Sequence, residues 1–168
     1  MSKHHVVIVG SGFGGLFAAQ SLARANVRVT LISKTNHHLF QPLLYQVATG
    51  ILSPGEIAPA TREVLKRQRN VRVLLGTVED VDPEKKTVYW RNYGLEKATK
   101  YDTLLVAAGV NQSYFGNDHF ATFAPGMKTI DDALEVRARI FAAFEQAEVA
   151  TDPERIKKLL TFVVVGAG

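Results

Sequence analysis

Three glycines near the amino end have the spacing of a phosphate-binding turn. Gly10, Gly12 and Gly15 form a G-x-G-x-x-G pattern directly after the apolar residues 6–9. In such a turn the first glycine allows a tight bend, the second lets a pyrophosphate approach the backbone, and the third lets a helix pack close to the strand. The free N–H groups at the helix N-terminus can then bind the phosphates. The pattern therefore predicts a dinucleotide site, with a purely structural turn as the alternative.

The segments around these glycines are the ones that such a site requires. Residues 6–9 are all β-branched, which is typical of a buried parallel strand, and the composition of residues 16–23 favours a helix. A second apolar run, residues 27–32, completes a β-α-β unit. Where an acidic residue usually binds the ribose hydroxyls, this chain has Ser33 and Lys34. Two interpretations remain open: a serine hydroxyl bonded to a ribose, or a base beside a 2′-phosphate.

Residues 36–55 contain no Asp, Glu, Lys or Arg and belong to the longest such stretch of the chain. Its apolar residues follow neither a helical nor a strand period. It can line a site for a flat organic group, or it can be a loop tucked under the domain. His37 and His38 are interpreted as ordinary loop residues, because side chains of neighbouring residues point apart and no third metal ligand is evident.

The remaining pattern predicts an α/β fold. We expect a helix over residues 61–68, a third strand over 71–75, an antiparallel meander over 77–101 and a buried strand over 101–109. A long helix is expected to begin after Thr129. Residues 161–168 repeat the opening, with an apolar strand followed by Gly-x-Gly. The predicted fold is a Rossmann-like domain with a parallel sheet and a small antiparallel meander, followed by a second Rossmann domain truncated after its first strand.

Composition narrows the function further. The chain has 168 residues, is 46% hydrophobic and contains no cysteine, which excludes disulfides, zinc ribbons and thiol redox pairs. The net charge of +4 comes without a basic helix or an aromatic-basic repeat, so no nucleic acid is expected as a partner. Residues 1–5 lead directly into the first apolar run, so no signal peptide is expected. The uncharged stretch contains His, Gln and Pro, which disfavour a membrane span.

Residues 36–50, with the sequence NHHLFQPLLYQVATG, resemble the signature of type II NADH:quinone oxidoreductases. These non-proton-pumping NADH dehydrogenases belong to the two-dinucleotide-binding flavoproteins, and Ser33-Lys34 with residues 109–127 is most similar to actinobacterial members. The resemblance covers the whole chain and implies that it is the N-terminal part. It implies FAD as cofactor, NADH as substrate, and electron transfer from NADH through bound flavin to a membrane quinone. The implied domains are residues 1–128 for FAD, a helical connector over 129–160, and the first strand of an NADH domain over 161–168.

The resemblance also implies which residues contact FAD. The glycine turn would hold the pyrophosphate, Ser33 and Lys34 would lie near the adenosine ribose, and Val78 would lie beside the adenine. Ala108 and Gly109 would run past the flavin, with Pro42 near the isoalloxazine. The full implied set is Gly10, Ser11, Gly12, Phe13, Gly14, Gly15, Ser33, Lys34, Pro42, Val78, Ala108 and Gly109. No catalytic acid or base and no metal ligand is predicted.

The family also implies a location and partners. We expect a cytoplasmic protein, peripheral on the inner face of the cell membrane when full length, which meets the membrane surface through its C-terminal part and could form a homodimer. The absence of cysteine separates it from disulfide reductases and sulfide:quinone reductases. The 168 residues alone are expected to be inactive. Two other functions stay open: a single-site NADPH-binding reductase, and a non-catalytic nucleotide-binding module.

Overall fold

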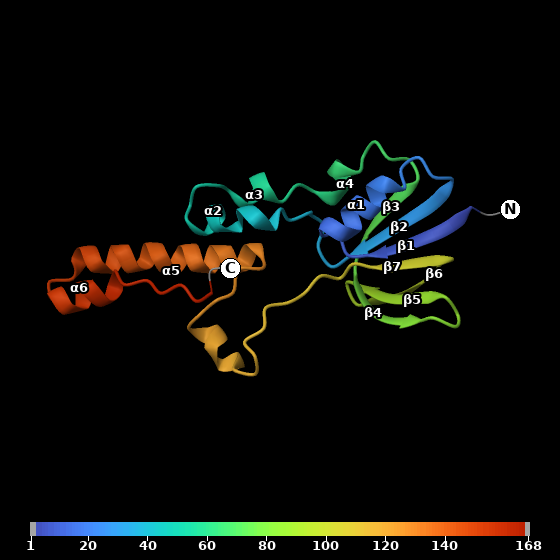
Figure 1. The fold of residues 1–168 in the computed structure, drawn as a ribbon. Coiled ribbons are helices and arrows are strands. Elements are labelled where there is room, and N and C mark those ends of the chain that lie inside the picture. Colours follow the sequence, from blue (N-terminus) through green and yellow to red (C-terminus); the bar gives the residue numbers. More distant parts are fainter. Residues whose placement is uncertain (1–2, 167–168) are drawn as a thin grey trace. The chain divides into compact units, whose positions relative to one another are not determined.

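The computed structural model describes residues 3–166, and the chain divides into two compact units. The first comprises the residues up to Phe40 together with Gly55–Asn111, and the second comprises Gln41–Pro54 together with the residues from Gln112 onward. Figure 1 traces the helices and strands of both in chain order. The predicted α/β class is confirmed, because the chain contains a parallel sheet, an antiparallel sheet and helices.

A four-stranded parallel sheet forms the centre of the first unit, with the strand order β3-β2-β1-β7. The strands are β1 (His4–Val9), β2 (Val27–Ser33), β3 (Val71–Leu75) and β7 (Thr103–Val106). Helix α1 (Phe13–Ser21) joins β1 to β2 and packs on one face of the sheet. The core on this face consists of Val6, Ile8, Leu16, Ala19, Val29, Leu31 and Leu65. Alternate residues along β1 and β2 point to this face, as the strand period requires.

The other face of the sheet is covered by the predicted antiparallel meander. It consists of β4 (Thr77–Asp82), β5 (Thr87–Asn92) and β6 (Leu95–Lys100), in that order. Val7 and Ile32, which alternate with the residues of the first core, pack here against Val88 of β5. All three side chains are fully buried. The centre of the sheet that carries the glycine turn is therefore covered on both faces, as is usual for parallel sheets. The edge strand β7 is largely exposed, so the buried strand expected over 101–109 is wrong in its burial and forms only over Thr103–Val106.

The helices between β2 and β3 in the sequence include α3 (Pro54–Ile57) and α4 (Thr61–Val64). The predicted helix over residues 61–68 was too long, because the α-helix ends at Val64. Beyond it, the Gln68 side chain donates to the Ala19 carbonyl at 2.7 Å, and that of Asn70 donates to the Leu22 carbonyl at 2.9 Å. These two bonds attach the chain to the end of α1 and direct it into β3.

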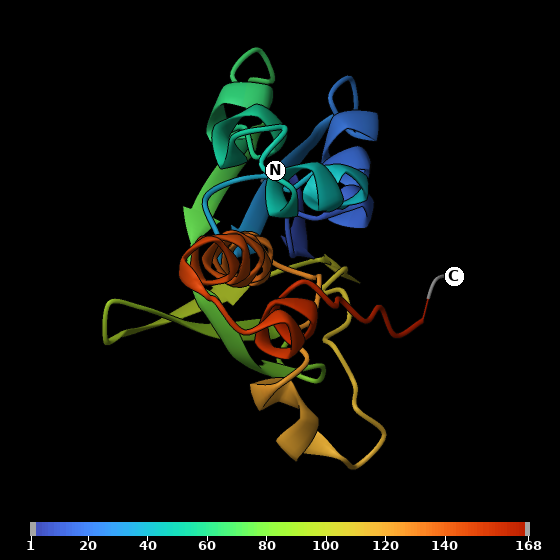
Figure 2. The same ribbon diagram turned by 90° about the vertical axis from the view of Figure 1, so that its left-hand side faces the viewer.

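The second unit is built around the long helix α5 (Ile130–Val149), which runs beside α2 (Leu44–Ala48) in both views (Figures 1 and 2). Its remaining helices are η1 (Gln41–Leu43), η2 (Asp118–Thr122) and α6 (Pro153–Leu159). Thr129 is the N-cap of α5 and forms a capping box with Asp132, so the predicted start of this helix is confirmed. On α2, Leu44, Val47 and Ala48 are buried.

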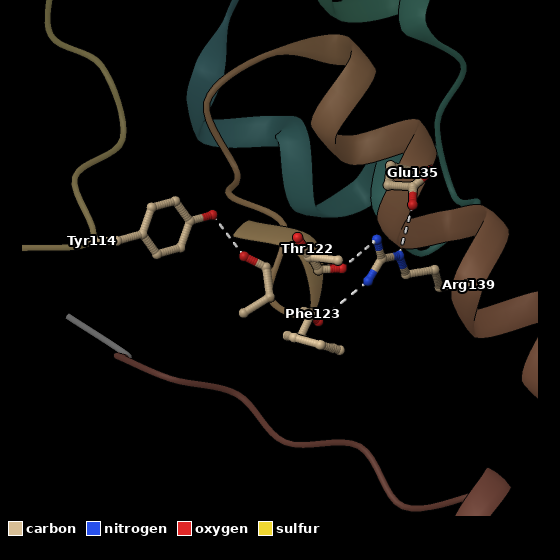
Figure 3. A network of polar contacts seen from close by, with 6 residues as sticks. Tyr114, Thr122, Phe123, Glu135 and Arg139 are labelled. Atoms are coloured by element: carbon tan, nitrogen blue, oxygen red, sulfur yellow. Dashed lines mark hydrogen bonds and ion pairs between the residues drawn. The ribbon is translucent and has the colours of Figure 1, made fainter. Parts of the chain in front are cut away.

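Arg139 of α5 holds the loop that contains η2 (Figure 3). Its Nε donates to the Glu135 carboxylate at 2.7 Å, while its two terminal nitrogens donate to the carbonyls of Phe123 and Thr122 at 3.2 and 3.1 Å. The Tyr114 hydroxyl donates to the Ala124 carbonyl at 2.6 Å. A planar guanidinium suits this arrangement because its donors form a fixed fork. The two bonds from Arg139 therefore attach the loop to α5, and the bond from Tyr114 connects two parts of the loop itself.

The apolar residues near the carboxyl end form no strand in the part of the chain that the structure describes. Residues 161–166, which we expected to begin a strand, belong to no sheet, and residues 167–168 lie outside the described residues. A strand needs a hydrogen-bonded neighbour, and no other described strand pairs with this segment. Val163, Val164 and Val165 are each more than 80% exposed. The repeat of the opening pattern is thus visible in the sequence but not as a strand.

Stability is expected to fall in acid because of His5 at the start of β1. His5 is buried, its Nδ1 lies 3.0 Å from the Arg28 guanidinium, and its Nε2 lies 2.8 Å from the Thr30 hydroxyl. A guanidinium can only donate, so Nδ1 accepts and Nε2–H donates. Burial, and next the Arg28 charge, lower the pKa of His5 below 6.5. The neutral ring therefore stabilises the fold above the unfolded-state pKa, and this stability is lost as pH falls through the lowered folded-state pKa.

Denaturant unfolding between pH 7.5 and pH 5 measures this effect, with His5→Gln as the comparison. Gln retains a donor for Thr30 but has no group that titrates in this range. We expect the free energy of unfolding of the natural protein to decrease more steeply with acid than that of H5Q. Equal slopes for the two proteins would show that His5 does not cause the pH dependence.

Candidate dinucleotide-binding site

The turn after β1 needs glycine at its first position. Gly10 has a φ of +101°, and its N–H donates to the Ile32 carbonyl at 2.8 Å. A Cβ atom at this position would overlap the carbonyl oxygen of Ala107 and lie 2.9 Å from its carbon. Both the positive φ and the nearby backbone exclude a side chain. The tight bend predicted at Gly10 is confirmed.

Gly15 lets α1 approach the strand closely, as predicted. It is buried, and a Cβ there would overlap the Gly10 carbonyl oxygen and lie 3.4 Å from the Ile8 side chain. The obstructing atoms belong mainly to the backbone, which cannot move as a flexible side chain can. The first turn of α1 therefore sits directly on the bend that precedes it.

Gly12 differs from the other two glycines because it faces open space. It is exposed, and a Cβ added to it would meet no atom within 4 Å. It is also the N-cap of α1, and no side chain caps this end of the helix. The first N–H groups of a helix, here those of Phe13, Gly14 and Gly15, have no acceptor within the helix itself. An anion could bind there with its charge at the positive end of the helix dipole.

Ser11 and Ser33 are both buried and bonded to each other, with their hydroxyl oxygens 2.8 Å apart. Ser11 also donates to the His37 carbonyl at 3.2 Å, which directs the Ser33 proton toward Ser11. The Ser33 oxygen accepts a weak bond from the Thr35 N–H at 3.4 Å. The ribose bond expected of Ser33 therefore competes with partners inside the protein. Lys34, the next residue, is exposed.

His38, which the sequence analysis interpreted as an ordinary loop residue, lies against the glycine turn. It is buried, and its Nδ1 lies 2.9 Å from the Ser11 carbonyl oxygen. Its ring lies nearly perpendicular to that of Phe13, with a centroid distance of 5.1 Å and an angle of 88° between the ring planes. Phe13 also packs against Phe40, at 5.5 Å. The beginning of the uncharged segment, residues 37–40, thus lies against the glycine turn, which no pattern within the sequence indicates.

The other predicted residues lie after β7, on β4 and in η1. Ala108 follows β7 beside the turn, since its Cα would lie 3.4 Å from a Cβ on Gly10, and exposed Gly109 has a φ of +74°. Val78 is half-buried in β4 and packs against the core on the meander side of the sheet. Pro42 is exposed in η1 of the second unit. Its predicted place near the isoalloxazine stays a prediction, as do all the cofactor contacts.

Residues 3–166 offer neither a metal centre nor a membrane-spanning helix. Within them, no group of three or more His, Cys, Asp or Glu side chains lies close enough together to hold a metal ion. None of the described helices is both long and apolar enough to cross a membrane. The chemistry that the described site offers is the binding of an anionic, phosphate-bearing ligand by backbone N–H groups.

Known proteins with similar sequences are NADH:quinone and NADH-ubiquinone oxidoreductases. The type II NADH:quinone oxidoreductase Ndh of Mycobacterium tuberculosis is 66% identical over 99% of this chain and 36% of its own length. An external alternative NADH-ubiquinone oxidoreductase of Yarrowia lipolytica mitochondria is 32% identical over 99% of this chain and 30% of its own length. The chain thus spans about a third of these relatives. The resemblance stated from the sequence is confirmed.

A solved structure and a family model agree with these relatives. The structure of NDH2 from Plasmodium falciparum in complex with NADH superposes with a TM-score of 0.82 at 28% identity, covering 93% of this chain and 32% of the other. The family model for pyridine nucleotide-disulphide oxidoreductases matches residues 4–168. The chain belongs to the pyridine nucleotide-disulphide oxidoreductase family.

Proposed function

We propose that this chain is the FAD-binding N-terminal part of an enzyme that passes electrons from NADH through bound flavin to a membrane quinone. One observation carries the proposal. Backbone atoms occupy the space where a Cβ would lie on Gly10 or Gly15, whereas the same space beside Gly12, at the start of α1, is open. This combination provides room for a pyrophosphate where helix N–H groups have no partner. The 66% identity to a type II NADH:quinone oxidoreductase supports the choice of FAD, NADH and quinone.

The described residues fit such a ligand. The N–H groups of Phe13, Gly14 and Gly15 would hold the pyrophosphate, and the exposed Lys34 would lie near the adenosine ribose. We assign Val78 to the adenine, Ala108 and Gly109 to the flavin end, and Pro42 to the ring. Bound FAD would supply the two-electron chemistry. The protein residues bind and orient it, and none of them is assigned a proton-transfer role.

The proposal extends to domains and location. Residues 1–128 would form the FAD domain and 129–160 a helical connector, and in the complete protein residues 161–168 would become the first strand of the NADH domain once neighbouring strands are present to pair with them. The apolar run that ends in a second Gly-x-Gly supports the last assignment. The complete protein would be peripheral on the cytoplasmic face of the membrane, reached through its C-terminal part, and could act as a homodimer.

One observation favours a second candidate, a reductase that binds NADPH at this single site. The Ser33 hydroxyl is bonded within the protein, so the residue that remains free at the ribose position is the exposed cation of Lys34. A cation without a neighbouring carboxylate would suit the 2′-phosphate of NADPH.

Titration of the flavin-depleted full-length protein with FAD and, separately, with NADPH distinguishes the two candidates. We expect saturable uptake of FAD. Anaerobic NADH should then bleach the bound flavin, and a water-soluble quinone should restore its colour. Tight NADPH binding without FAD uptake would contradict the proposal and support the single-site reductase.

A further inference from the structure

We propose that His38 is a positioning residue, which sets the orientation of the glycine turn for the dinucleotide. The inference rests on the proposed function for the identity of the ligand. The hydrogen bond itself is independent of any ligand, because it joins two parts of the protein.

The bond from His38 fixes one peptide group of the turn. Its partner, the Ser11 carbonyl, can only accept, so Nδ1 carries the proton. A trans peptide group is planar, with its carbonyl and N–H pointing in opposite directions. The N–H of Gly12 in the same peptide group must therefore point away from His38. A single side chain thus determines the direction of a donor at the open end of α1.

Further contacts hold His38 itself in place. Its own N–H donates to the Pro59 carbonyl at 2.9 Å, and its ring packs perpendicular to that of Phe13. The preceding residue, His37, forms an isolated β-bridge with Ala60 and accepts the bond from Ser11. Both the carbonyl and the side chain of Ser11 are therefore attached to residues 37–38. Supporting contacts of this kind keep a binding group close to its productive geometry.

The turn needs such support because it is rich in glycine. Gly12 has no Cβ atom, so its backbone is less restricted than that of other residues. Order that exists before the ligand arrives lowers the cost of binding. His38 supplies this order from outside the turn, where it does not occupy the space in front of Gly12.

Three substitutions of His38 distinguish the effect of losing its hydrogen-bond donor from the effect of changing the size of its side chain. His38→Leu removes the donor, whereas His38→Asn keeps a nitrogen donor near the position of Nδ1. His38→Gln places its donor farther out, where Nε2 lies. His4→Leu is the matched control, because His4 is exposed at the opposite end of β1 and bonds to the Thr103 hydroxyl. The full-length protein is used for all four variants.

The first measurement needs no ligand. Hydrogen exchange of a peptide that covers residues 9–16 should be about tenfold faster in H38L than in the natural protein, the size expected for a lost buried hydrogen bond. Exchange in H38N and H4L should stay close to the natural rate. Unchanged exchange in H38L would overturn the positioning role, whatever ligand the site binds.

The second measurement uses FAD. We expect H38L and H38Q to bind FAD about tenfold more weakly, with H38N restoring the affinity. The ³¹P resonances of the bound pyrophosphate should shift in H38L and return in H38N. If H38L does not fold, equal affinities of H38N and H38Q would overturn the inference. If the natural protein takes up no FAD, the proposed function fails, and the exchange experiment still decides the role of His38.

Discussion

The Gly12→Val protein is expected to fold like the natural protein and to lose its affinity for FAD. Gly12 has a φ of −67° and a ψ of −169°, which valine adopts without strain, and the new Cβ meets no atom within 4 Å. The isopropyl group would instead fill the space that we assign to the pyrophosphate. We expect the dissociation constant for FAD to rise at least about 100-fold, or about 2.7 kcal/mol. Titration by flavin fluorescence measures it.

Gly55→Val is the matched control for Gly12→Val. A Cβ added to Gly55 would also meet no atom within 4 Å, and this glycine lies in α3, outside the proposed contacts. Both variants should stay folded when FAD is absent, with G12V less stable by about 1 kcal/mol because valine is a poorer N-cap than glycine, and only G12V should lose FAD. Natural affinity in G12V would show that the pyrophosphate lies elsewhere.

The Gly15→Ala protein is expected to lose stability even without a ligand. Alanine is normally favoured over glycine within a helix by about 1 kcal/mol. Here its Cβ would overlap the Gly10 carbonyl oxygen and lie 2.9 Å from the carbonyl carbon, so α1 must move away from β1. We expect a loss of about 3 kcal/mol or more in the free energy of unfolding, as for other severe overpacking in a core. Denaturant unfolding of the flavin-free protein measures it.

Gly14→Ala provides the comparison within the same helix turn. Its Cβ would lie 3.6 Å from the Ala107 Cβ, an ordinary van der Waals contact, so the helical preference of alanine should dominate. We expect G14A to be as stable as the natural protein or slightly more stable. Equal stabilities for G14A and G15A would contradict the close packing at Gly15.

Much of the fold could be predicted because its signals are local. The β-branched run before Gly10 and the helix-favouring residues after Gly15 indicate a β-α-β unit, and the structure contains it. The meander was predictable from its turns in the same way. Thr129 and Asp132 form a capping box close together in sequence, so the start of α5 was also readable from neighbouring residues.

The errors arose where distant contacts decide the structure. The helix that begins at Thr61 ends early because Gln68 and Asn70 bond to the end of α1, which lies far away in sequence. The segment at 161–166 has the composition of a strand but no described strand beside it. The propensity of a segment cannot supply a hydrogen-bonding partner.

Within the candidate site, the glycines were predictable and their surroundings were not. The glycine pattern has a fixed spacing, and each glycine meets the backbone environment that its role requires. The pairing of Ser11 with Ser33 and the bond from His38 to Ser11 span 22 and 27 residues. Such contacts depend on how β1, β2 and the following loop come together. Judged by its residue type alone, His38 was therefore interpreted as an ordinary loop residue.

The visible absorption spectrum of the purified full-length protein tests the central claim most directly. If the glycine turn holds the pyrophosphate of FAD, the protein should show the absorption band of a bound flavin, or acquire it on incubation with FAD. Passage through a desalting column should leave the band with the protein. A colourless protein that takes up no added FAD would contradict the account.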